Sequence, residues 1–407
     1  MISHIVPISS LLGGMGILLA GSGLLGTLLG LRGTLAGFSD LTVGIVMAAF
    51  FLGYVVGARF CPPIIARVGH ARAFSAFAAA SAAISLAYGL YESPYFWGVL
   101  RVANGITLVG VYMVIESWLN ERVTDHRAQV FSAYMMVSLI ALALGQYLLL
   151  PFGVDGLGSF LLIGVLFCIG LIPIALTPVA QPIITQSISL PLKKLYKKAP
   201  VGVAGGLVSG MVIGSFWSLA AVYGNRSALD TAGVANLFAL AIIGGALLQW
   251  PIGKLSDSRD RRMVLVWVAL GGALACVLMQ FSRPLGIPLP VAGFFFGSFA
   301  FSLYGLAVAQ THDRFHSSEA LEATKSLLFL HGAGAVIGPL VAGSLMTIAS
   351  TVIFPAVVAV MQLCLAAYTL VHLRSDPPVP IEDRSQFLPM SRSSPVAMDL
   401  DPRSPSP

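Results

Sequence analysis

Hydrophobic residues form long uninterrupted stretches along this chain, and charged residues fall almost entirely in the gaps between them. A helix of about twenty residues rises about 30 Å, which is the thickness of the hydrocarbon core of a bilayer. The pattern predicts twelve membrane-spanning helices, at residues 11–31, 41–60, 72–91, 96–119, 128–150, 157–177, 201–223, 232–252, 263–282, 289–311, 323–347 and 352–373. A chain that crosses a membrane this often and has little outside it is expected to be a transporter.

The composition excludes a soluble domain of ordinary type. Hydrophobic residues make up 57% of the chain and charged residues only 10%, with a mean hydropathy of +0.88. Soluble domains carry about 25% charged residues. The net charge of +6 lies in short loops beside the spans, so we expect the bilayer to be its partner and expect no nucleic acid.

The basic residues indicate how the chain is oriented. With the N-terminus inside, nineteen of the 23 Lys and Arg fall in cytoplasmic loops or the tail, and Arg101 lies within a span. The outer side holds Arg32, Arg226 and Arg283. Because basic residues concentrate on the cytoplasmic side, we expect a multi-pass protein of a bacterial inner membrane, with both termini in the cytoplasm. The first span lacks a basic leader and a convincing cleavage site, so it is expected to be retained.

The chain repeats itself in two halves. The six spans of the second half start about 190 to 195 residues after those of the first half. Two six-helix halves are typical of one transporter architecture, in which the substrate site lies near the midplane between them. The expected organisation is an N-terminal half at 1–177, a basic cytoplasmic linker at 178–200, a C-terminal half at 201–373 and a disordered tail at 374–407. The linker contains four lysines and is either an amphipathic segment on the membrane surface or a solvated loop.

The loop after the second span of the second half carries a motif. It reads Gly253-Lys-Leu-Ser-Asp257-Ser-Arg-Asp-Arg261-Arg262. Gly253 would let helices approach closely, while Asp257 would cap the next segment and bind arginines of the loop, latching one conformation. The spacing resembles the loop signature of the major facilitator superfamily, which implies an all-helical membrane fold of twelve helices in two pseudo-symmetric halves.

The corresponding first-half loop departs from that signature. It keeps Arg67 and Gly69 but has Ala66 where the aspartate belongs, which weakens the case for a latch there; simple anchoring of the loop on the cytoplasmic side is the alternative. In the eleventh span, Gly338-Pro339 is expected to bend or gate the helix, or else to serve packing alone.

The fourth span carries further motifs. Its sequence Leu100-Arg101-Val-Ala-Asn104-Gly105 is similar to the arginine signature of the superfamily. The chain also resembles the YcaD-like group of bacterial permeases through Tyr112-Met-Val-Ile-Glu116-Ser117-Trp118-Leu119-Asn120, Ala133-Tyr134-Met135-Met136-Val137, Gly145-Gln146, Gln249-Trp250-Pro251-Ile252-Gly253 and Leu303-Tyr304. The resemblance covers residues 10–373 and implies a fold and a class of mechanism without naming a substrate.

One acid and one base lie clearly within the spans, Glu116 and Arg101. A charge in the hydrocarbon costs about 2.5–3.5 kcal/mol even on mild scales, so such residues mark a pathway by default. At 100° per residue, Arg101, Asn104, Tyr112 and Glu116 share one helical stripe, which should face a central cavity. Arg101 is predicted to bind an anionic or polar group of the solute, and Glu116 to take up and release protons. The alternative for Glu116 is a simple ion pair with Arg67, Arg72 or Arg127.

Other polar residues of the spans are weaker candidates. Arg32 is expected near the outer end of the first span, at a vestibule or the membrane surface. Gln146 and His331 occupy related positions in the two halves, and Tyr304 and Trp217 would form an aromatic wall or pack in the core. Gln249 is expected to bond backbone groups freed at Pro251.

These observations predict a monomeric secondary active transporter that moves a small solute by alternating access, coupled to protons. We expect no enzyme activity, no cofactor and no metal: the four cysteines have no ligand spacing, and no Gly-x-x-x-x-Gly-Lys-Ser/Thr sequence would bind ATP. The alternatives are a hydrophobic drug or toxin efflux pump, a sensor or scaffold that does not transport, and a membrane enzyme using a metal near His312, Asp313, His316, Glu319 and Glu322. The tail, rich in Pro and Ser, is expected to be dispensable for transport.

Overall fold

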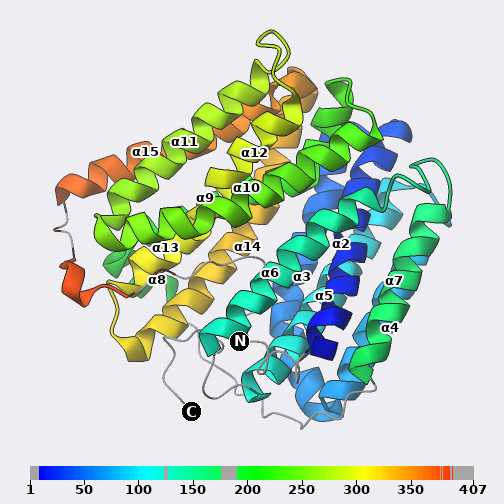
Figure 1. The fold of residues 1–407 in the computed structure, drawn as a ribbon, viewed down its shortest axis with the longest axis horizontal. Coiled ribbons are helices and arrows are strands. Elements are labelled where there is room, and N and C mark those ends of the chain that lie inside the picture. Colours follow the sequence, from blue (N-terminus) through cyan, green and yellow to red (C-terminus); the bar gives the residue numbers. More distant parts are fainter. Residues whose placement is uncertain are drawn as a thin grey trace. The chain divides into compact units, whose positions relative to one another are not determined.

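The computed structural model of the chain describes residues 9–122, 127–175, 190–375, 377, 379–385 and 387. Within these residues the secondary structure is helical and contains no strand (Figure 1). The linker residues 178–189 and the tail residues 388–407 lie outside this part of the chain, as do the side chains of Arg122 and Arg127.

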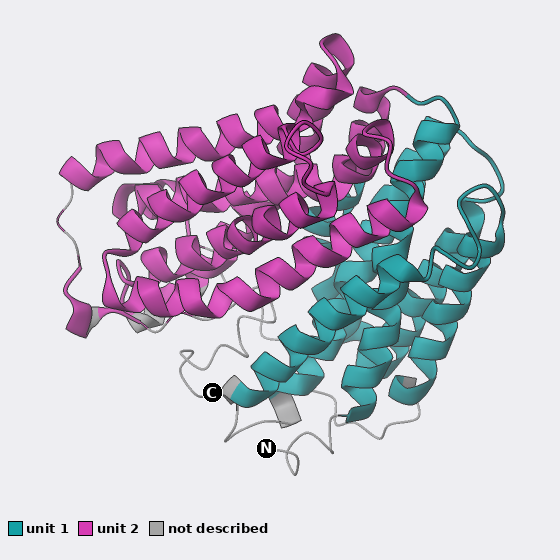
Figure 2. Cartoon of the chain, turned by 45° about the horizontal axis from the view of Figure 1, so that its top comes forward, with its two compact units in different colours: residues 1–38, 49–187, 392–404 teal, residues 39–48, 188–391, 405–407 magenta. Residues whose placement is uncertain are grey.

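The chain forms two compact units (Figure 2). The described helices of unit 1 are α2 (Ser9–Leu35), α3 (Asp40–Val68) from residue 49 onward, α4 (His70–Ala87), α5 (Pro94–Arg122), α6 (Arg127–Tyr147) and α7 (Gly158–Ala175). Within this unit α2 packs on α6 and α7, while α4 packs on α5 and α7.

Unit 2 contains the start of α3, residues 39–48, together with the second half of the chain. Its helices are α8 (Leu192–Lys198), α9 (Pro200–Arg226), α10 (Thr231–Ser258), α11 (Arg261–Gln280), α12 (Leu289–Ala300), α13 (Ser302–His312), α14 (Ser317–Ile348), η2 (Thr351–Ile353), α15 (Phe354–Ser375) and η3 (Ile381–Asp383). Within it α9 packs on α14, α10 on α12, and α11 on α15.

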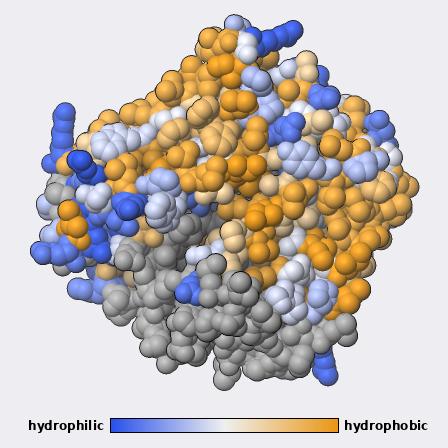
Figure 3. Space-filling model, in the orientation of Figure 1, coloured by the Kyte–Doolittle hydropathy of each residue, from blue (hydrophilic) through white to orange (hydrophobic). Residues whose placement is uncertain are grey.

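The predicted all-helical membrane fold is confirmed, and each predicted span coincides with helical structure. Ten helical segments of the described chain are long and apolar enough to cross a membrane, and α7 adds a shorter apolar helix. The span predicted at 289–311 is divided, because Phe301 separates α12 from α13. Exposed hydrophobic side chains cover much of the visible surface in Figure 3, as lipid-facing helices require.

Close backbone packing joins α9 to α14, and we call this contact the glycine seam. A Cβ added at Gly214 would fall 2.5 Å from Ala335 Cα, and one at Gly334 would fall 2.9 Å from the Met211 nitrogen. Gly210 and Gly338 meet backbone atoms of the opposite helix in the same way. Small residues allow this approach, which in a membrane supplies packing that the hydrophobic effect does not.

A similar contact joins α3 to α5 within unit 1. A Cβ at Gly105 would fall 2.7 Å from the Tyr54 nitrogen, and one at Gly53 would fall 2.8 Å from Val102 Cα. The Phe50 carbonyl lies closer still to Gly105. The approach therefore fixes the α3 backbone beside the stripe of α5 that carries Arg101.

Part of the linker and part of the tail are ordered in the structure. The short helix α8 buries Leu195, while Lys194 and Lys198 pair with Glu319 at 2.5 and 3.2 Å. Hydrogen bonds from these lysines lower the pKa of Glu319. The disordered tail expected from Arg374 stays a prediction; α15 continues to Ser375, and Pro377, Ser385 and Phe387 form hydrogen bonds with Arg314, Asp313 and Asp257.

Candidate functional site

Arg101 is buried in unit 1, with 5% of its surface exposed. Its guanidinium carbon lies 4.7 Å from the centre of the Phe50 ring, a cation–π contact between α5 and α3. Among the described residues its Nε atom has no hydrogen-bond partner, and no carboxylate lies within ion-pair distance of its side chain. The charge is thus held by an aromatic face and is not neutralised by an acid of the described chain.

Glu116 is fully buried on α5, three helical turns beyond Asn104. The hydroxyl of Tyr134, on α6, donates a hydrogen bond of 2.5 Å to its Oε1 atom. Of the proposed partners of Glu116, Arg67 and Arg72 are exposed and neither forms an ion pair with it, and the Arg127 side chain lies outside the described residues. The geometry therefore pairs the buried acid with a phenol of a neighbouring helix.

The other members of the predicted stripe lie beside these two groups. Asn104 is buried, and within the described part of the chain its Nδ2 atom has no hydrogen-bond partner. Tyr112 is buried with its ring centre 6.2 Å from that of Tyr54 on α3. The Tyr54 ring in turn lies 6.0 Å from Phe50. Aromatic rings of α3 and α5 thus line the stretch between Arg101 and Glu116.

Two of the weaker candidates have structural partners within unit 1. Arg32 donates to Glu92 at 2.6 Å and to the Val154 carbonyl at 2.9 Å, at the end of α2. Gln146 is fully buried, accepts a 2.5 Å hydrogen bond from Thr27 and donates to the Leu142 carbonyl at 3.0 Å. The Arg32 and Thr27 bonds join α2 to other parts of unit 1.

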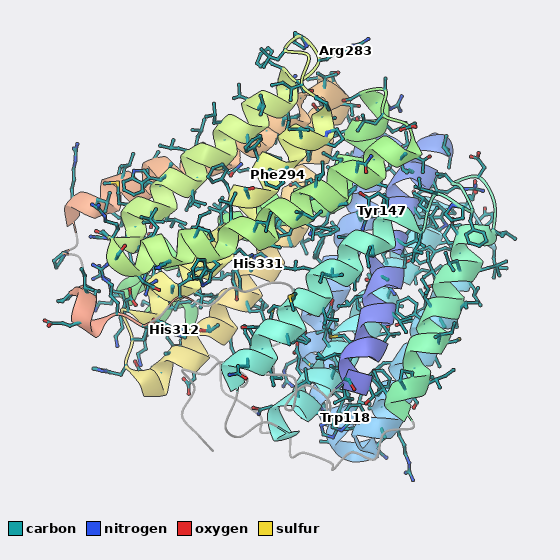
Figure 4. The ribbon with its side chains drawn as sticks, in the orientation of Figure 1. Trp118, Tyr147, Arg283, Phe294, His312 and His331 are labelled. Carbon is teal, nitrogen blue, oxygen red and sulfur yellow. The ribbon has the colours of Figure 1, made fainter. Side chains whose placement is uncertain are left out.

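In unit 2, His331 and Tyr304 do lie together. Their ring centres are 4.6 Å apart, and His331 Nδ1 lies 3.0 Å from Ser209 Oγ. The Tyr304 hydroxyl is buried and has no hydrogen-bond partner among the described residues. His331 projects from α14, as labelled in Figure 4. Trp217 stacks on Phe238 with ring centres 5.6 Å apart, so it belongs to an aromatic cluster in the core of unit 2.

The structure corrects the expectation for Gln249, while gating by Gly338-Pro339 stays a prediction. Gln249 donates a hydrogen bond of 2.9 Å to the Phe301 carbonyl. Its amide therefore binds a backbone group at the break between α12 and α13 and not one freed at Pro251. Gly338 lies in the glycine seam, and α14 runs without interruption through Pro339. The described contacts of Gly338 are therefore those of packing.

The predicted loop from Gly253 to Arg262 spans the end of α10 and the start of α11, and it forms a charge network that includes Asp257. Arg261 is buried and contacts Asp257 at 2.9 Å and Asp313 at 2.7 Å. Burial raises the pKa of Asp313, and the neighbouring Arg261 opposes this shift without cancelling it. The predicted latch residues thus meet an acid, Asp313, that follows α13 and was not assigned to the latch from the sequence.

The helix cap in this loop differs from the expectation. Asp257 lies in the last turn of α10, which runs to Ser258, and Asp260 caps α11 by accepting from the Arg262 nitrogen at 3.0 Å. Arg262 also pairs with Asp260 at 2.8 Å. Burial acts to raise the pKa of Asp260, but the hydrogen bonds and charge of Arg262 outweigh it and lower the pKa.

The first-half loop contains a glycine with a special backbone. Gly69 has a φ of 86° and ψ of 155°, a region that only glycine adopts readily, and it precedes α4. The next residue, His70, is buried and its Nε2 lies 3.0 Å from Ser117 Oγ on α5. Arg67 is exposed, and among the described residues it forms no ion pair, in contrast to Arg261 of the second half.

Side chains of the suggested metal cluster near His312 bind other groups of the protein. His312 (Figure 4) bonds Thr324, Asp313 bonds Arg261, and Glu319 bonds two lysines. Among the described residues no group of three or more His, Cys, Asp or Glu side chains is placed to hold a metal ion.

Comparison with known proteins agrees with this architecture. A family model described as Major Facilitator Superfamily matches residues 204–397. An uncharacterized MFS-type transporter, YcaD, of Shigella flexneri serotype 5b is 28% identical over 358 residues, covering 85% of this chain and 90% of the relative. YcaD of Escherichia coli strain K12 / DH10B is 27% identical over 349 residues, covering 83% and 88%.

Solved structures share the fold at low sequence identity. The nucleoside transporter NupG, as a D323A mutant, superposes with a TM-score of 0.79 at 12% identity, covering 91% of this chain and all of that one. A bacterial homologue of the human lysosomal transporter Spinster superposes with a TM-score of 0.70 at 14% identity, covering 93% and 98%. The second half of the chain thus matches the superfamily model, and most of the chain resembles the MFS-type transporter YcaD.

Proposed function

We propose that this protein is a proton-coupled secondary transporter of a small anionic or zwitterionic solute. The observation that carries the proposal is Arg101: a buried cation, stacked on Phe50, with an Nε atom that has no partner among the described residues. A buried charge without a counter-charge is costly. A carboxylate or phosphate of a solute would supply that counter-charge and accept hydrogen bonds from the guanidinium.

Glu116 supplies the proton step in this proposal. It lies fifteen residues from Arg101 on α5, about 22 Å along the helix axis, so the two groups act at separate positions. The Tyr134 hydroxyl favours the ionised form by donating to it, whereas burial favours the neutral form. Opening of the Glu116 site to one side of the membrane or the other would change the balance between the ionised and neutral forms. Glu116 would then take up or release a proton.

The solute site is tested by ligand-induced stabilisation of the detergent-purified protein. A ligand at about one hundred times its dissociation constant stabilises by about 2.7 kcal/mol. We expect an anionic or zwitterionic solute to raise the melting temperature of the wild type and of Arg32→Ala but not that of Arg101→Ala. Arg32 is the matched control because it pairs with Glu92 at the end of α2. Equal stabilisation of both variants would contradict the proposed role of Arg101.

The proton step is tested in proteoliposomes under an imposed pH gradient. Glu116→Gln keeps the size of the side chain and a hydrogen-bond acceptor for Tyr134, but it cannot carry a proton. We expect it to abolish gradient-driven accumulation while leaving exchange of solute across the membrane. Unchanged accumulation would refute coupling by Glu116.

A hydrophobic solute is the second candidate. The observation that favours it is the aromatic lining formed by Phe50, Tyr54 and Tyr112 beside Arg101. In that case lipophilic cations or neutral drugs would stabilise the protein, and Arg101→Ala would leave the stabilisation unchanged.

A further inference from the structure

Described residues of the tail contact the end of α10, the start of α11 and the residues that follow α13. The backbone nitrogen of Phe387 donates to Asp257 at 3.0 Å. The nitrogen and hydroxyl of Ser385 donate to Asp313 at 3.1 and 3.2 Å. The tail thus contacts both carboxylates that bind Arg261 in the loop network.

The arginines of the region complete this arrangement. Arg261 donates to the carbonyl of Ser385 as well as to the two carboxylates. Arg384 donates to the Arg259 carbonyl, which follows the end of α10. Arg314 donates to the Pro377 carbonyl at 2.8 Å. The tail therefore touches the ends of α10, α11 and α13 together.

A hydrophobic contact anchors the same segment. The Phe387 ring occupies the space beside Gly253, where a Cβ would fall 2.7 Å from its Cγ atom. The ring also packs against the hydrophobic cluster that includes Ile252, Val264 and Leu265. The glycine of the loop motif therefore makes room for a side chain of the tail.

We propose that residues 377–387 form a clasp that restrains the loop at 253–262, so that this loop changes its contacts only after the tail leaves. The contact consists of a half-buried ring and a few hydrogen bonds without a covalent link, so it is reversible. It is favourable because only eleven residues separate Phe387 from the end of α15, which gives a millimolar effective concentration. This inference goes beyond the proposed function and requires no knowledge of the solute.

The contact itself is tested by a disulfide. Gly253→Cys with Phe387→Cys should oxidise readily in membranes and lose reactivity towards a maleimide mass tag. The matched control is Leu255→Cys with Phe387→Cys, because Leu255 lies on the same helix and is 41% exposed. Both pairs are made in a background without the natural cysteines Cys61, Cys168, Cys276 and Cys364. Equal loss of free thiols in both pairs, or none in either, would overturn the docked position.

The restraint is tested by hydrogen–deuterium exchange of the full-length protein in detergent. Phe387→Ala should speed exchange of the amides at 253–262 on the order of tenfold, the equivalent of losing a half-buried aromatic ring. Ile381→Ala is the matched control, since that tail side chain is 63% exposed, and the first-half loop at 62–70 should not change. An unchanged exchange rate at 253–262 in Phe387→Ala would refute the clasp.

Discussion

Substituting Gly105 by alanine tests whether the close approach of α3 and α5 is required by the fold. The added methyl group would fall 2.7 Å from the Tyr54 nitrogen and closer still to the Phe50 carbonyl. Both obstacles are backbone atoms, so no side-chain rotation relieves the clash. The helices must separate by roughly 1 Å to restore an ordinary contact distance, and the Phe50 ring would move away from Arg101 with them.

The expected cost follows from this geometry. Overpacking of a tight contact destabilises by about 1–3 kcal/mol, and the rigid backbone obstacle places Gly105→Ala in the upper part of that range. For a unit of this size the melting temperature should fall by roughly 4–8 °C. The assay is thermal unfolding in detergent, followed by circular dichroism at 222 nm. The matched control is Gly98→Ala on the same helix, where a Cβ would meet no atom within 4 Å.

The control should behave in the opposite direction. Alanine is a better helix former than glycine by about 1 kcal/mol, so Gly98→Ala should leave the melting temperature unchanged or raise it. A Gly105→Ala protein as stable as Gly98→Ala would refute the argument, because it would show that the two helices separate at no cost. Loss of solute-induced stabilisation in Gly105→Ala alone would connect the spacing of the helices to the position of Phe50.

Three further changes have definite expected outcomes. Thr27→Val removes the hydroxyl that donates to buried Gln146, and leaving that acceptor unsatisfied should cost about 1–3 kcal/mol in thermal unfolding. Gly69→Ala forces a side chain into a backbone region that only glycine adopts readily, and should cost about 1–3 kcal/mol. Asp260→Asn keeps the cap of α11 but removes the charge that pairs with Arg262; it should lower the melting temperature at neutral pH by an amount that shrinks on acidification, since the pKa of Asp260 is lowered in the fold.

The sign of the last effect follows from that lowered pKa. The ionised carboxylate stabilises the fold fully above its ordinary value of 3.8, and this stabilisation is lost as the pH falls through the lower value of the folded state. If the difference in melting temperature between the wild type and Asp260→Asn widened on acidification, this result would contradict a stabilising ion pair. For Thr27→Val and Gly69→Ala, the controls are Thr34→Val, whose hydroxyl bonds only its own helix, and Gly26→Ala, where the added methyl meets no atom; effects equal to those of the controls would contradict both arguments.

The apolar helices were predictable from sequence because hydrophobicity over about twenty residues decides whether a segment stays in a bilayer. The same reasoning could not find the break at Phe301, since α12 and α13 together form one apolar segment. Sequence reasoning also assigned the cap of α11 to Asp257, whereas Asp260 is the cap. The error arose because the end of α10 depends on packing that a local motif does not reveal.

The site was predicted in part. The spacing of Arg101 and Glu116 predicts a shared stripe, and both residues are buried on α5, but their partners Phe50 and Tyr134 come from other helices. Contacts between spans depend on the rotation of each helix about its axis, and a single sequence fixes that rotation weakly when all faces are apolar. The docking of Phe387 was missed for a related reason: a segment rich in proline and serine lacks the apolar content to fold alone, yet binds when a complementary surface already exists.

The glycine seam between α9 and α14 also bears on how the protein can evolve. Where two backbones touch, no side chain is present to be varied, and any substitution at Gly210, Gly214, Gly334 or Gly338 must first push the helices apart. Glycine is therefore expected to be retained at these four positions. Changes in selectivity would have to accumulate on other faces of the two helices, as at His331 and Ser209, where side chains of both meet and can be exchanged without moving the backbone.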